Sequence, residues 1–234
     1  MRTGLVLAHV LELKYRDESA QSSEERQPLL PAESARLSRP PAQDVAKQKG
    51  KMLAKLVGIT ELDQHFADIA DTFNQQQDHY GNMTEAFRVL KDSYGCSHRN
   101  SLSECLQRIR EEHGGVQLSL QMQGYDFTLV VLGRQPVGLQ KVQEQVILLG
   151  RAAKAVVAAG PKLQSMIGWV LQGEEQLEQR VRDASHTYQE ELRMEANLRE
   201  NLQAVHCAGE LSTRYRREAG AVLTEAARLA NGQP

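Results

Sequence analysis

The sequence predicts a mostly α-helical protein, folded as an antiparallel helix bundle or an elongated coiled coil. Two observations predict this fold class. Several segments repeat apolar residues at alternating steps of four and three, which places those residues on one face of a helix. Aromatic residues make up only 5% of the 234 residues, so helical packing around Leu, Val and Ala is favoured over a sheet-based core.

Residues 16–43 differ in composition from the rest of the chain. They are rich in Ser, Glu, Arg, Gln and Pro, and their four prolines block regular structure. Such a segment buries too little apolar area to offset the entropy lost on ordering. We therefore predict a disordered tail over residues 1–43 and a helical domain over residues 44–234.

A basic amphipathic helix is predicted from Asp44 to Val57. Lys47, Lys51 and Lys55 recur at four-residue spacing and form a basic stripe along it. Beside an anionic lipid surface each lysine would contribute about 1 kcal/mol, so peripheral membrane contact is one interpretation of the stripe. A solvated helix face is the other interpretation.

The clearest apolar pattern lies between residues 61 and 94. Gln76 is its single polar position, Thr60 is expected as the N-cap, and Gly95 is well placed as a left-handed C-cap. We predict one nearly continuous helix whose apolar seam is a packing surface rather than a reaction centre. Gly81 lies inside this helix, where we expect a kink or a close helix contact. The seam contains Leu62, Phe66, Ile69, Phe73, Tyr80, Phe87 and Leu90.

The segment after Gly95 contains a helix signal and an ambiguous stretch. The Ser101–Glu104 capping box predicts a short helix that ends before Gly114. In residues 116–132, apolar and polar residues alternate strictly from Val116 to Met122, and residues 127–132 after Gly124 are rich in β-forming types, which predicts a small β-hairpin. The same stretch also fits helical steps of four and three, so strand and helix both stay open.

Further helices are predicted in the C-terminal half. Residues 142–156 form a second apolar ladder, which we expect to end at Gly160 and Pro161 because proline breaks helix interiors. A short apolar helix follows. Residues 173–229 predict one long charged helix with a narrow apolar stripe, which should bind a second copy of the chain or another helical protein.

Charge and residue patterns argue against several functional classes. With 28 basic and 30 acidic residues the net charge is −2, so no global field favours nucleic acid. Ser, His, Cys and Asp residues form no nucleophile-elbow or base-paired pattern, so we predict no enzyme activity. Cys96, Cys105 and Cys207 lack paired metal-ligand spacing, so we expect no metal or other cofactor. Their odd number favours a reducing compartment.

A short acidic and apolar motif lies in the predicted tail. Glu25 stands four positions before the adjacent leucines Leu29 and Leu30, and Pro28 holds the segment extended. Residues 25–30 resemble the acidic dileucine sorting signal. The resemblance implies binding by clathrin adaptors, which seat the two leucines in a pocket and the acidic residue near basic side chains.

Together these patterns indicate a non-enzymatic helical adaptor or scaffold that binds other helical proteins or itself. The dileucine motif favours a cytoplasmic protein placed peripherally on endosomes or lysosomes. Two alternatives stay open. One is a membrane-shaping dimer that resembles a BAR domain, which would need three long antiparallel helices and basic residues along one curved face. The other is a cytoskeletal or nuclear coiled-coil assembly subunit, which the helix pattern permits equally.

Overall fold

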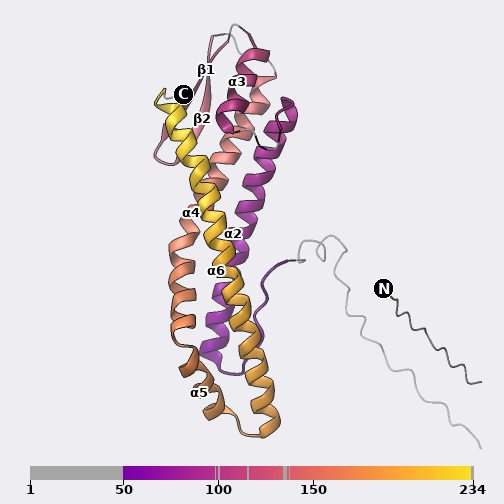
Figure 1. Cartoon of the computed structure of the whole chain (residues 1–234), viewed down its shortest axis with the longest axis vertical. Coiled ribbons are helices and arrows are strands. Elements are labelled where there is room, and N and C mark those ends of the chain that lie inside the picture. Colours follow the sequence, from indigo (N-terminus) through magenta and orange to yellow (C-terminus); the bar gives the residue numbers. More distant parts are fainter. Residues whose placement is uncertain are drawn as a thin grey trace, which may run out of the picture. The chain divides into compact units, whose positions relative to one another are not determined.

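The computed structural model describes residues 50–97, 99, 101–114, 116–133, 136 and 138–232. Over these residues the chain forms five helices and one two-stranded antiparallel sheet (Figure 1). The predicted mostly helical bundle with a hairpin is confirmed. The tail predicted over residues 1–43 lies outside the described residues. The elements are α2 (Thr60–Ser93), α3 (Leu102–Glu112), β1 (Gln117–Gln123), β2 (Asp126–Leu132), α4 (Leu139–Gln172), α5 (Glu174–Ala184) and α6 (Tyr188–Ala230).

Three long helices, α2, α4 and α6, lie side by side and form the body of the bundle (Figure 1). The colours of Figure 1 show that α4 runs in the opposite direction to the other two. α4 packs extensively against both neighbours. Its residues Leu149, Ala153 and Val156 are fully buried. Burial of a leucine or valine side chain contributes about 1.5–3 kcal/mol, so this line of α4 is the core of the domain.

The two ends of α2 are capped differently. Ile59, rather than the predicted Thr60, is the N-cap residue, and no side chain caps this end. At the other end Gly95 has a φ of +58°, and the Cys96 N–H donates to the Lys91 carbonyl at 2.9 Å. This Schellman arrangement confirms Gly95 as the left-handed cap.

α4 continues through Gly160 and Pro161, so the helix end predicted there is wrong. Pro161 lacks the N–H that would bond to the carbonyl four residues earlier, which costs about 3 kcal/mol in a helix interior. Continued burial offsets this cost, because Leu163 and Val170 are 0% and 1% exposed and extend the ladder of residues 142–156. The short helix predicted after Pro161 is the last part of α4.

Gly81 and Gly160 have opposite surroundings. Nothing lies within 4 Å of the position that a Cβ would take at Gly81, so the close helix contact expected there is absent. At Gly160 a Cβ would stand 2.2 Å from Cδ of Arg216. Because Arg216 belongs to α6, it is Gly160 that allows a close approach between two long helices.

The long helix predicted over residues 173–229 is two helices, so that prediction is wrong. Thr187 Oγ1 accepts a hydrogen bond from the Glu190 N–H at 3.2 Å, and the His186 N–H donates to the Glu190 carboxylate at 3.2 Å. These bonds cap the start of α6 inside the charged stretch. The chain turns between α5 and α6, and α5 packs against α6.

α3 begins with the predicted capping box. Ser101 Oγ accepts from the Glu104 N–H at 3.2 Å, and the Glu104 carboxylate accepts from the Ser101 N–H at 2.8 Å. The Ser103 N–H donates to the Glu225 carboxylate of α6 at 2.9 Å. These bonds fix the start of α3 and attach it to α6.

The stretch at residues 116–132 is a hairpin, which decides between the strand and helix interpretations that its sequence left open. β1 and β2 pair antiparallel through a two-residue turn, in which Gly124 supplies a φ of +63°. β1 lies against α6 and β2 lies against α4. The strand interpretation holds because alternate side chains are buried against these helices. The buried strand residues are Leu118, Leu120, Phe127 and Leu129.

Candidate interaction surfaces

The apolar seam of α2 faces the interior of its own bundle. Leu62, Phe66, Ile69, Phe73 and Leu90 are each at most 3% exposed, whereas Tyr80 and Phe87 are partly buried against the core. The apolar stripe of α6 is likewise buried, for example at its residues 198, 205 and 223. Both ladders are therefore covered by helices of the same chain, and a partner would have to use other surfaces.

The segment at residues 51–58, which we call the strap, is extended and contains no helix. The predicted basic helix is therefore wrong over this part, and Lys47 lies outside the described residues. Asn74 of α2 bonds both backbone groups of Met52: its Oδ1 accepts from the Met52 N–H at 2.8 Å and its Nδ2 donates to the Met52 carbonyl at 2.9 Å. Asn201 of α6 does the same at Lys55, with both bonds at 2.8 Å.

Further side chains hold the end of the strap. Asn197 Nδ2 donates to the Leu56 carbonyl at 2.8 Å. The Asp63 carboxylate accepts from the N–H groups of Val57 at 2.6 Å and Gly58 at 3.1 Å. A helix would hide these backbone groups in its own hydrogen bonds, so the extended form prevails because α2 and α6 supply partners for them.

The strap lysines lie against carboxylates. Lys51 pairs with Asp78 and also donates to the Asn74 carbonyl at 3.1 Å, and Lys55 pairs with Glu200. The basic stripe predicted from the four-residue spacing is therefore not formed by these two residues. Membrane contact through the lysines stays a prediction.

An open hollow lies between α2 and α4, and we call it the outer groove. It has a volume of about 590 Å³, and all the residues around it come from these two helices. A neighbouring hollow of about 450 Å³ shares Val89 and Gln145 with it and reaches Tyr94 and His113. Leu148, which lines the outer groove, is 50% exposed. The other apolar residues that line the outer groove are Ala86, Val89, Ala152 and Ala155.

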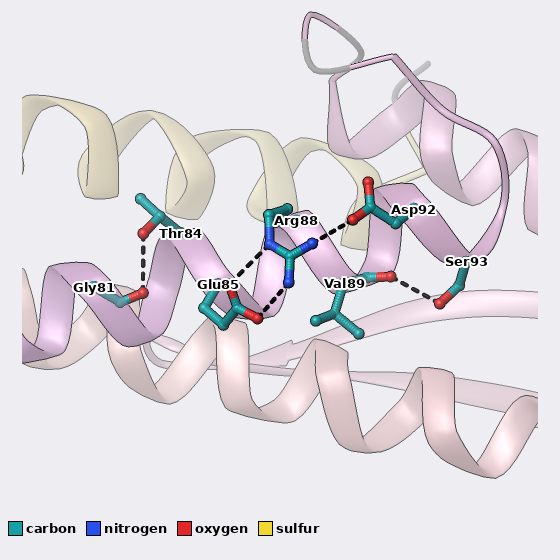
Figure 2. Close-up of polar contacts among 7 residues, drawn as sticks. All are labelled: Gly81, Thr84, Glu85, Arg88, Val89, Asp92 and Ser93. Atoms are coloured by element: carbon teal, nitrogen blue, oxygen red, sulfur yellow. Dashed lines mark hydrogen bonds and ion pairs between the residues drawn. The ribbon is translucent and has the colours of Figure 1, made fainter. Parts of the chain in front are cut away.

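Polar residues of α2 beside the outer groove are paired with one another (Figure 2). Arg88 donates to the Glu85 carboxylate at 2.9 and 2.7 Å and to the Asp92 carboxylate at 2.5 Å. The hydrogen bond from Arg88 lowers the pKa of Glu85. Thr84 and Ser93 donate to backbone carbonyls of the same helix at 2.9 and 2.7 Å. Of these residues only Glu85 lines the outer groove, whose other polar lining residues are His79, Asn82, Gln145 and Arg151. A ligand would therefore meet the apolar lining with polar residues among it.

A tyrosine in the middle of the bundle connects α2 to α6. The Tyr80 hydroxyl donates to Glu218 at 2.5 Å, and its ring stacks on Tyr215 with 4.0 Å between centroids. Burial, aided by this carboxylate, raises the pKa of Tyr80 to about 12. Tyr80 is therefore a neutral hydrogen-bond donor at neutral pH, which suits a structural tie between the helices.

Within the described ranges, no three His, Cys, Asp or Glu side chains are placed together to hold a metal ion. None of the helices in those ranges has both the length and the apolar character that a bilayer crossing requires. The dileucine residues Glu25, Leu29 and Leu30 lie outside them. No family model, curated protein or solved structure matches the chain.

The asparagines of the strap site were not among the predicted site residues. Asn197 and Asn201 are four residues apart on α6, and Asn201 directly precedes Leu202, which continues the apolar stripe from Leu198 to Val205. Asn201 is 1% exposed, so its amide requires hydrogen-bond partners. Because Leu202 keeps the stripe unbroken, the apolar pattern carries no signal that the neighbouring asparagine is buried.

Proposed function

We propose that the protein is a non-enzymatic helical adaptor or scaffold, and that the outer groove binds an amphipathic helix of a partner protein. The observation that supports this proposal is the open hollow of about 590 Å³ between α2 and α4, lined by apolar side chains that no other element of the described chain covers. The seams of α2 and α6 are already occupied by the bundle, so this face remains for binding.

The dimensions and lining of the groove favour a helix as its occupant. From His79 to Tyr94 the two hollows follow α2 for about 22 Å, the length of roughly four helical turns. Ala86, Ala152 and Ala155 have short side chains, which let another helix approach closely. A partner helix with apolar residues at steps of three and four would cover this lining and the exposed side of Leu148.

Leu148→Glu tests the groove, and Leu192→Glu is its matched control. Leu192 lies on α6, outside the groove, and is 49% exposed, against 50% for Leu148. Neither change should unfold the chain, because both side chains are half in solvent. Each tagged variant is compared with wild type by affinity capture with quantitative mass spectrometry, and captured partners are then tested as purified proteins.

We expect Leu148→Glu to weaken binding of a purified helical partner about tenfold or more and Leu192→Glu to leave it unchanged. Hydrogen exchange on the complex should show protection at residues 79–94 and 139–155. Equal binding by both variants would refute the groove as the site. A wild-type dimer in sedimentation equilibrium that Leu148→Glu dissociates would assign the groove to a second copy instead.

We place this function at endosomal or lysosomal membranes, on the support of Glu25, Leu29 and Leu30 alone. Replacing both leucines by Ala should shift a tagged protein away from endosomal puncta without changing its thermal unfolding. The outer-groove variant should keep its puncta, because its change lies far from the motif in sequence. A diffuse or filamentous pattern for wild type would favour the cytoskeletal or nuclear alternative.

A further inference from the structure

We propose that the channel between α2 and α6 is a binding site for extended peptides, which the strap fills in cis and which a partner's segment of the same chemistry can take over. The favoured ligand carries a basic residue at its first and fifth positions and an apolar residue at its second and seventh. This site is separate from the outer groove and does not depend on it.

The channel recognises the backbone of its occupant. Asn74 and Asn201 each bond the N–H and the carbonyl of one residue, at Met52 and at Lys55. The two clamped residues are three positions apart along the strap, and each is bonded from a different helix. Because these four bonds involve no side chain of the occupant, they would form with any extended segment that enters.

The channel also requires an occupant. Asn201 is only 1% exposed, and its amide oxygen and nitrogen each bond the Lys55 backbone. Without the strap its amide would lose both partners in a position where water has little access. An extended backbone from some chain must therefore fill this position.

Side chains give the channel its sequence preference. Met52 and Val57 are 7% and 0% exposed, so two apolar seats lie five residues apart. Asp78 and Glu200 hold Lys51 and Lys55 at the two basic positions. These contacts define the pattern of the proposed ligand.

Two positions of the strap contribute little to the channel through their side chains. Leu53 and Leu56, also three positions apart, are 74% and 70% exposed. A segment with polar residues at these two positions could therefore make the same channel contacts. The strap can leave the channel without unfolding α2. It joins α2 through Gly58, whose φ is +98°, and a glycine can change its backbone angles readily.

The test uses the full chain and a fluorescein-labelled peptide with the sequence of residues 50–58. Lys51→Glu combined with Lys55→Glu turns both strap ion pairs into like-charge contacts and also removes the bond from Lys51 to the Asn74 carbonyl, while Met52 and Val57 stay unchanged. The strap of wild type competes with the peptide at an effective concentration of the order of mM. We expect the double variant to bind the peptide about tenfold more tightly than wild type does, as measured by fluorescence anisotropy.

Two further arms separate backbone recognition from nonspecific adhesion. The same peptide with N-methyl groups at the residues equivalent to Met52 and Lys55 lacks both clamped donors and should not bind. Adding Asn74→Ala to the double variant should abolish binding, while Asn82→Ala, at an exposed asparagine of the same helix, should not.

Several results would overturn the proposal. Equal affinity of wild type and the double variant for the peptide would show that the strap does not occupy the site. Undiminished binding of the N-methylated peptide would exclude backbone clamping, and this arm needs no change in the protein. A dimer that forms by exchange of straps, seen by sedimentation, would make a second copy the occupant in place of a partner protein.

Discussion

Replacing Gly160 by Ala tests how closely α4 and α6 pack where α4 passes through its proline. A Cβ at this position would stand 2.2 Å from Cδ and 2.3 Å from Nε of Arg216. Nε of Arg216 is buried and has no hydrogen-bond partner, so the side chain is held there by packing. The added methyl group must push the Arg216 side chain aside or separate the two helices.

Two opposing contributions set the expected change in the free energy of unfolding. Ala is favoured over Gly in a helix interior by about 1 kcal/mol. Forcing an extra carbon into a packed contact costs about 1–3 kcal/mol. Gly160→Ala should therefore destabilise wild type by roughly 0–2 kcal/mol. In an Arg216→Ala background the obstacle is absent, and the same change should stabilise the chain by about 1 kcal/mol.

A double-mutant cycle by urea unfolding measures the difference between the two backgrounds. Wild type, the two single variants and the double variant are compared at one temperature, with their denaturant slopes checked for agreement. The expected coupling energy is about 1–3 kcal/mol. Additive changes within about 0.5 kcal/mol would show that Arg216 does not obstruct position 160, and the reasoning about this contact would be wrong.

Two further predictions concern the seam of α2. Phe73→Ala should destabilise the chain by about 3–5 kcal/mol, because the ring is 3% exposed and its removal leaves a cavity. Phe87→Ala should destabilise the chain less, because the Phe87 ring is only partly buried. Equal melting temperatures of the two variants would contradict this order. Tyr80→Phe should lower stability at neutral pH by about 1–2 kcal/mol through loss of the bond to Glu218. Since folding raises the pKa of Tyr80 from 10.0 to about 12, its contribution is complete below pH 10 and is lost as the pH rises towards 12. The stability difference between wild type and Tyr80→Phe should therefore shrink over that interval, and a constant difference would show that the phenol does not titrate as its surroundings require.

The sequence alone predicted those features that depend on residues close together in the chain. The four–three spacing located α2, because a helix repeats its buried face at that step. Gly95 and the Ser101–Glu104 capping box located helix ends, because their hydrogen bonds join residues only a few positions apart. The alternation before Gly124 indicated a hairpin but did not exclude a helix, because the same residues also fit helical steps of four and three.

Predictions failed where a distant contact decided the local structure. Residues 51–57 have a helical pattern, yet Lys55 is extended because Asn201, 146 positions away, bonds its backbone. Gly160 and Pro161 read as a helix end, yet burial of the following residues against the other long helices carries α4 onward. The outer groove has no sequence signal of its own, because it depends on how α2 (Thr60–Ser93) and α4 (Leu139–Gln172), which are far apart in the sequence, lie against each other.

Buried amide side chains fix how the elements of the bundle are aligned, which apolar periodicity alone does not do. Gln76 is 0% exposed, and its Nε2 donates to the carbonyl of Val156 at 3.0 Å, which ties α2 to α4 at one height. Asn201 ties α6 to the strap in the same way. An amide on a seam can bond a backbone only when the two elements are aligned, so shifting either one along the bundle would leave the amide buried without a partner. Gln76 thus selects one register of α2 against α4 from the several that an apolar seam allows. The outer groove depends on that alignment, because its lining residues from α2 and α4 come together only in the register that Gln76 selects.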